Sequence, residues 1–161
     1  MSRTPMVSER VPVLRIPPLL LFEDAGGSAV IGLVAPEVIF ACVVNDASHD
    51  LVSRVSTVFE SFAAEAGRVS LFLDLRSSDW ADPVTGKIVL KTGLRTRRNL
   101  DSMTALVQSS HAPAVKRIAH SLLGSAAFVT ASPDEFDNLL IDAAPLAHQQ
   151  MHHSLCVRQS G

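Results

Sequence analysis

Short apolar runs alternate along the chain with amphipathic stretches of helical period, which is the pattern of an α/β protein. Val38–Val44 and Val69–Leu75 are apolar enough to be strands buried on both faces of a sheet. Between these runs, apolar residues recur at the spacing of a helix that ends near Gly67, namely Leu51, Val55, Val58 and Phe62. The sequence thus predicts a strand, a helix and a second strand, with Val69–Leu75 as the central strand of the sheet.

Turn signals define the remaining strands. The glycine-rich stretch Asp24–Gly27 separates Leu19–Glu23 from Ala29–Val34, and it predicts either a hairpin or two adjacent strands. Further strands are expected over Met103–Gln108 and Ala126–Thr130. A polar loop, residues 76–82, is expected to leave the carboxyl end of the central strand.

Two later helices are predicted from caps and periodicity. Ala112–Leu123 should stop at Gly124. The expected apolar face of this helix consists of Val115, Ile118, Ala119 and Leu122. A last helix should start at Ser132 as the N-cap, with Pro133 in its first turn and Glu135 completing a capping box. Its expected buried side consists of Phe136, Leu139 and Leu140.

The segment Pro83–Asn99 is less regular. A helix is favoured, because proline suits a first helical turn and basic residues follow at helical spacing. The division between its apolar and polar faces is poor, however, since Val84 and Ile88 fall close to the basic stripe. A short strand over Lys87–Lys91, between two glycines, is the alternative.

The order of elements requires crossover connections. We therefore expect an α/β fold with a mixed, partly parallel sheet of about five to six strands and helices packed on it. A proline-punctuated arm over residues 1–17 should precede the domain at 18–142, and a tail over 143–161 should follow it. A chain of 161 residues is long enough to bury one proper core.

Several segments resemble the STAS-like superfamily of anti-sigma-factor antagonists, and most of all its bacterial, SpoIIAA-like group, which is related to the lipid-exchange (CRAL-TRIO) domains. They are L-F-L-D-L-R-S-S-D at 71–79, the basic segment at 95–98, A-L-V-Q-S-S at 105–110 and A-A-F-V-T-A-S-P-D-E-F at 126–136. The resemblance implies a STAS-like fold and a regulatory module without enzymatic activity that docks to another protein, as a homodimer.

Anti-sigma-factor antagonists carry an Asp-Ser-Ser-Gly motif, whose second serine is phosphorylated. The matching stretch here is Asp82-Pro83-Val84-Thr85-Gly86, which has one residue inserted, lacks the first serine and contains a proline. The resemblance makes Thr85 a candidate phosphosite, with Ser77 and Ser78 as neighbouring candidates. The alternative is a capped, solvated loop without regulation.

The predicted partner-binding surface follows the central strand. Trp80 is the expected anchor, since a lone tryptophan beside a polar loop is typical of an interaction hot spot. The remaining members are the acidic Asp79 and Asp82 and a basic stripe formed by Lys87, Lys91, Arg95 and Arg98. The stripe suits an acidic partner protein or an anionic headgroup. The alternatives are that Trp80 covers the core and that the stripe is an ordinary solvated helix face.

Composition excludes several classes of function. The net charge is −2, tyrosine is absent and one tryptophan is present, so nucleic-acid binding is not expected. No stretch approaches the ~18 apolar residues of a transmembrane helix. Cys42 lies in an apolar run and Cys156 is distant from it, which fits a reduced, cytoplasmic setting.

Candidate chemistry is sparse. Asp74, Asp79 and Asp82 are close enough in sequence to bind Mg²⁺, although structural roles in a turn are favoured. The motif H-x-x-x-H-H of His148, His152 and His153 would need a further ligand such as Cys156. His111 and His120 have no identifiable catalytic partner. We therefore expect no catalytic residue, metal or cofactor, and an enzyme is the less favoured class.

Two other functions remain open. A carrier of a small hydrophobic ligand, or a small enzyme, would use a pocket between the sheet and the segment 83–99. A sizeable apolar cavity with an aspartate or histidine pointing into it would favour that class. A structural or assembly protein would instead use its terminal extensions to bridge subunits.

Overall fold

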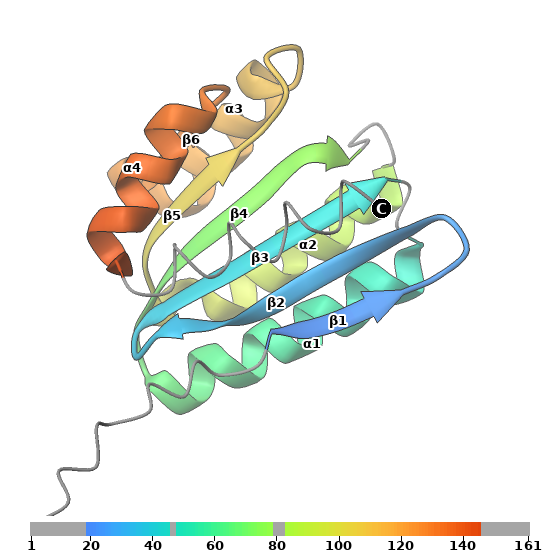
Figure 1. Ribbon diagram of the computed structural model, residues 1–161, viewed down its shortest axis with the longest axis horizontal. Helices are drawn as coiled ribbons and strands as arrows, with labels where there is room; N and C mark the ends of the chain where they lie inside the picture. The colour runs from blue at the N-terminus through green and yellow to red at the C-terminus, as the bar shows by residue number, and fades with distance from the viewer. Residues whose placement is uncertain (1–18, 46–47, 79–82, 146–161) are drawn as a thin grey trace, which may run out of the picture.

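The computed structural model describes residues 19–45, 48–78 and 83–145, which form one six-stranded sheet with four α-helices (Figure 1). The strands are β1 (Leu20–Glu23), β2 (Gly27–Ala35), β3 (Val38–Asn45), β4 (Val69–Ser78), β5 (Leu100–Leu106) and β6 (Ala127–Thr130). The α-helices are α1 (His49–Ala66), α2 (Pro83–Thr96), α3 (Ala112–Leu123) and α4 (Pro133–Ala143). Two 3₁₀ turns, η1 (Arg97–Asn99) and η2 (Gly124–Ala126), follow α2 and α3.

The six strands lie in the sheet in the order in which they occur in the chain. β1, β2 and β3 pair antiparallel, whereas β3, β4, β5 and β6 pair parallel. The predicted class, a mixed and partly parallel sheet with helices packed on it, is confirmed. The central strand predicted over Val69–Leu75 lies in the interior of the sheet, between β3 and β5.

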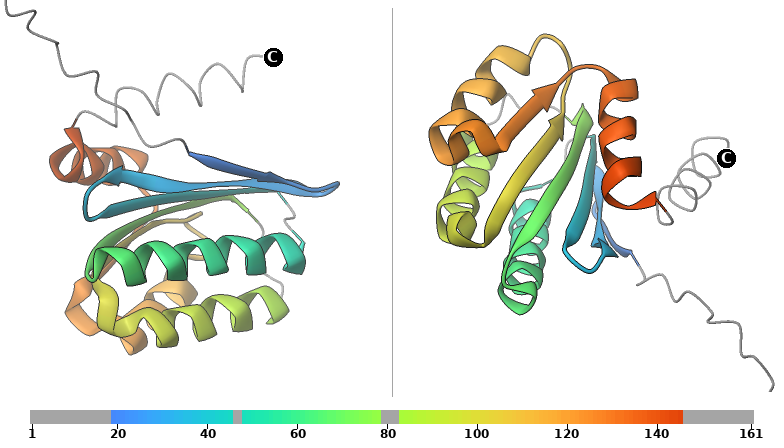
Figure 2. Two further views of the ribbon diagram at one scale, coloured as in Figure 1. Left: turned by 90° about the horizontal axis from the view of Figure 1, so that it is seen from below. Right: turned by 90° about the vertical axis from the view of Figure 1, so that its left-hand side faces the viewer.

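The topology determines which face each helix covers. Right-handed crossovers that always advance in the same direction place all their helices on one face of the sheet. The helices α1, α2 and α3 connect the four parallel strands, and all three lie on that face (Figure 2). α4 follows the last strand and packs on the opposite face (Figure 2).

The local signals that delimit α1 and the hairpin are present. β1 and β2 form the antiparallel hairpin, and the Asp24 carboxylate accepts hydrogen bonds from the backbone N–H groups of Gly26 and Gly27. Ser48 caps the start of α1 by accepting a hydrogen bond from the N–H group of Leu51. Gly67, at φ 80°, ends this helix with a conformation that costs glycine little.

Three predicted boundaries need correction. Ser77 and Ser78 pair with the end of β3, so β4 continues through residues that were expected to form a loop. β5 begins at Leu100, three residues before the predicted start, because Leu100 pairs with Val69 despite the polar Asp101 and Ser102 that follow it. The alternative strand over Lys87–Lys91 is wrong, because these residues are helical.

The start of α4 also differs in detail. Ser132 is the N-cap, as predicted, and accepts a hydrogen bond from the N–H group of Glu135 at 3.3 Å. The reciprocal bond of a capping box is missing among the described residues. The Glu135 carboxylate instead accepts from the hydroxyl of Thr130, and that hydroxyl accepts from the N–H group of Ser132. Leu139 was expected to be buried but is 39% exposed.

The two faces of the sheet bury different cores. On one face, Phe136 of α4 packs edge-on against Phe72 of β4, with ring centroids 5.7 Å apart, and Leu106 and Leu140 are fully covered. The other face packs against α1 and α3 through two further clusters. In the part of the chain that the structure describes, no helix is long and apolar enough to cross a membrane.

Candidate functional site

The predicted partner-binding surface is only partly within the described residues. Asp79, Trp80 and Asp82 lie outside them, as do the arm 1–17 and the histidines at 148–153. On α2, the side chains of Lys87 and Lys91 are exposed. Arg95 pairs with Glu60 of α1 at 3.3 Å, and Arg98 is exposed in η1, beyond the end of the helix.

The three candidate phosphosites have different surroundings. Ser77 is exposed. Ser78 is 5% exposed, and its hydroxyl donates a hydrogen bond to the carbonyl of Leu75 at 3.3 Å. Thr85 is partly buried in the first turn of α2. Phosphorylation at these positions stays a prediction.

Asp74 takes part in a structural ion pair. Its carboxylate is bound by the Nε and the terminal nitrogen of Arg76, at 3.1 and 2.8 Å, and by the backbone N–H of the same residue. This pair raises the pKa of Arg76. Burial raises the pKa of the neighbouring Cys42 thiol to about 12, which keeps it protonated and unreactive. Among the described residues, no group of acidic, histidine or cysteine side chains could hold a metal ion.

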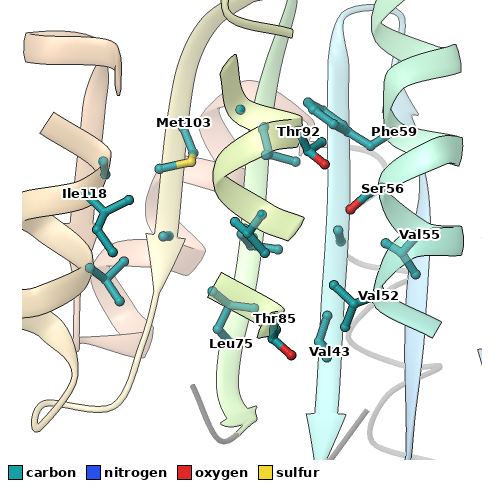
Figure 3. Close-up of a pocket in the computed structure, with 18 of the residues that line it drawn as sticks. Val43, Val52, Val55, Ser56, Phe59, Leu75, Thr85, Thr92, Met103 and Ile118 are labelled. Atoms are coloured by element: carbon teal, nitrogen blue, oxygen red, sulfur yellow. The ribbon is translucent and has the colours of Figure 1, made fainter. Parts of the chain in front are cut away.

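The most prominent feature is a cavity of about 360 Å³ between the sheet and the three crossover helices. Its floor consists of side chains from β2, β3, β4 and β5, and its walls come from α1, α2 and α3 (Figure 3). Most of these side chains are aliphatic or aromatic, and none of the described lining residues is charged. Ile118 of α3 lines the cavity and is itself 48% exposed.

The cavity exists because α2 presents small side chains to the sheet. The four α2 residues that line it are Thr85, Val89, Thr92 and Gly93. Both leucines of the helix and Val84 are exposed instead, with Val84 46%, Leu90 38% and Leu94 55% exposed. A helix that faced the sheet with leucines would fill this volume.

The alternative function would use a pocket between the sheet and the segment 83–99, and the cavity lies there, but its lining residues were not predicted. One signal was available. Thr85, Val89, Thr92 and Thr96 recur at i, i+4, i+7 and i+11, which marks an inward stripe of modest side chains on α2. The basic stripe on the opposite side of the helix is the stronger pattern in the sequence, so the inward stripe was not recognised.

Comparison with known proteins identifies the fold. No family model and no curated protein matches the sequence. A crystal structure of an uncharacterized protein of the DUF3478 family from Shewanella loihica PV-4, described as having a SpoIIAA-like fold, superposes with a TM-score of 0.56. The two chains are 16% identical, and the match covers 74% of this chain and 98% of that one. This chain therefore has a SpoIIAA-like fold, as the resemblance in its sequence predicted.

Proposed function

We propose that the protein binds a small, largely apolar molecule in the cavity beneath α2. The cavity volume of about 360 Å³ carries this proposal, because it lies within the roughly 300–1,000 Å³ of ligand-binding pockets. A void of this size costs stability unless a bound molecule fills it, since the side chains around an empty void lack packing partners on one side.

The lining favours binding over catalysis. Of the two features expected for this class of function, the apolar cavity is present, but no described residue of its lining is an aspartate or a histidine. The hydroxyl groups of Ser56, Ser78 and Thr92 have no base beside them in the described lining that could activate them as nucleophiles. A carrier or ligand-sensing module is therefore the function that these residues support best.

Two substitutions of the same kind on α2 test the proposal. Val89 lines the cavity, whereas Val84 is 46% exposed and does not line it. Val89→Phe should fill the cavity and weaken binding of the neutral fluorophore N-phenylnaphthylamine by about tenfold or more. Val84→Phe should leave this binding unchanged.

Fluorescence titration gives the affinities, and urea unfolding checks that both variants fold. Saturating fluorophore should also stabilise the wild type, by about 2.7 kcal/mol at one hundred times its Kd. Equal binding by Val89→Phe and the wild type, or no saturable binding by the wild type, would contradict the proposal.

A docking function has its own support. The outer face of α2 combines the exposed cations Lys87 and Lys91 with the exposed Leu90 and Leu94. Exposed apolar side chains with lysines beside them are suited to bind the surface of an acidic partner protein. Docking through this face and through Trp80 is therefore the second candidate function.

Affinity capture from the native host discriminates between these functions. Trp80→Ala and the double variant Lys87→Glu/Lys91→Glu should each lose the partners that the wild type captures. Lys116→Glu, a charge reversal at an exposed position on α3, should retain them. Unchanged capture by both test variants would count against docking.

A further inference from the structure

We infer that the ligand of the cavity is an uncharged molecule with an apolar body and one hydroxyl group that donates a hydrogen bond between α1 and α2. This inference rests on the proposed function, and it names the chemical class of the ligand. Three properties of the cavity support it: the charge of the lining, the hydrogen-bonding state of two hydroxyl groups, and the position of those groups.

The lining of the cavity disfavours binding of a charged ligand. A carboxylate, phosphate or ammonium group that enters an apolar cavity loses its hydration and needs a partner of opposite charge. No described lining residue can supply one. The polar lining residues are all neutral, namely Asn45, Ser56, Ser78, Thr85 and Thr92.

Two of these polar side chains face the space between the helices (Figure 3). Ser56 of α1 and Thr92 of α2 direct their oxygen atoms into the space between the two helices, beside Phe59 (Figure 3). Met103 and Ile118 line the opposite side of the cavity with apolar groups (Figure 3). A bound molecule would therefore place its polar group at the α1–α2 side and its apolar body toward β5 and α3.

The hydrogen-bonding state of these hydroxyls determines what they can receive. Thr92 donates its proton to the carbonyl of Ile88 at 2.9 Å, so toward the cavity its oxygen can only accept. The Ser56 hydroxyl has no hydrogen-bond partner among the described residues, and it can donate or accept. A ligand hydroxyl that donates to Thr92 and accepts from Ser56 matches both groups, whereas a carboxylate finds one donor and repels the lone pairs of Thr92.

Helix α2 contains a matched control for Thr92. Thr96 makes the same type of bond, from its hydroxyl to the carbonyl four residues earlier, at 2.7 Å. Both threonines are buried, with exposures of 8% and 4%. Only Thr92 lines the cavity. Replacement by valine therefore removes the same intrahelical bond at both positions but changes the cavity at only one.

The experiment displaces N-phenylnaphthylamine from the whole 161-residue chain with three molecules of one chain length. Dodecanol has the hydroxyl donor, dodecyl methyl ether accepts but cannot donate, and dodecanoate is charged at neutral pH. Dodecanol should compete about fivefold better than the ether, the scale of one neutral hydrogen bond. It should compete at least about tenfold better than dodecanoate.

In Thr92→Val the advantage of dodecanol over the ether should shrink, because only Ser56 remains to accept its proton, while Thr96→Val should retain the full advantage. Dodecanoate competing as well as dodecanol, or an unchanged ratio in Thr92→Val, would overturn the inference. The proposed function would survive that result if Val89→Phe still weakened fluorophore binding by about tenfold or more. No fluorophore binding by the wild type would overturn both.

Discussion

Asp24 shows how one exposed side chain joins two elements. Its Oδ1 accepts from the N–H groups of Gly26 and Gly27, both at 2.9 Å, and its Oδ2 accepts from the N–H of Ser48 at 3.0 Å. The β1–β2 turn is thereby tied to the N-cap of α1. Hydrogen bonds from the side chain and backbone of Ser48, followed by those from Gly26 and Gly27, lower the pKa of Asp24 from 3.8 to about 2.

This pKa implies an acid-dependent contribution to stability. Because the folded pKa lies below the unfolded value, the ionised carboxylate stabilises the fold above about pH 4, and the contribution is lost as the pH falls to about 2. Asp24→Asn should remove this part of the pH dependence. Urea unfolding at several pH values between these limits measures it, and equal slopes for the two proteins would contradict the assignment.

At the scale of the element, α2 is a poorly buried helix that contains two glycines. Gly86 and Gly93 lie within the continuous helix, and no described residue of it is buried except Thr92 and Thr96. Each glycine costs a helix about 1 kcal/mol relative to alanine. A methyl group at residue 86 would meet no atom within 4 Å, whereas one at residue 93 would lie 3.0 Å from the Cδ1 of Leu122 on α3.

The two glycines should therefore respond differently to the same substitution. Gly86→Ala should raise the free energy of unfolding by about 0.5–1 kcal/mol through helix propensity alone. Gly93→Ala has the same gain in propensity but must displace Leu122, so its net gain should be smaller. Urea unfolding of both variants tests this, and an equal gain at both positions would show that Leu122 moves without cost.

Helix boundaries, the start of β5 and the lining of the cavity were predictable from the sequence to different degrees. Caps and stops such as Ser132, Gly67 and Gly124 act locally, so they predict boundaries well. The start of β5 was missed, because pairing with β4 and not a local pattern orders Leu100. The cavity lining was missed for a related reason: the poor division between the faces of α2 left its inward side unassigned, and periodicity does not show whether the side chains on that side reach the sheet.

For the whole molecule, the decisive contrast lies between the two faces of the sheet. The face under α4 is filled around Phe72 and Phe136, whereas the face under α2 contains the cavity. We expect the filled face to supply much of the stability and the hollow face to accommodate ligand. A protein that binds in its core gives up part of its packing for that function.

Two strand leucines on opposite faces make this contrast measurable. Leu106 of β5 is fully buried in the cluster under α4, whereas Leu71 of β4 is 8% exposed and lines the cavity. Leucine-to-alanine substitutions cost about 2–5 kcal/mol, and the cost rises with the size of the void that the smaller side chain leaves behind. Leu106→Ala should fall near the upper end of this range in urea unfolding.

Leu71→Ala should fall near the lower end of the same range, because part of the Leu71 surface already borders empty space and is less tightly packed in the wild type. Leu71→Ala should also enlarge the cavity and preserve binding of N-phenylnaphthylamine. Equal losses of stability for the two variants would mean that the cavity closes around Leu71 in solution. The expectation that the face under α4 supplies much of the stability and the face under α2 accommodates ligand would then be wrong.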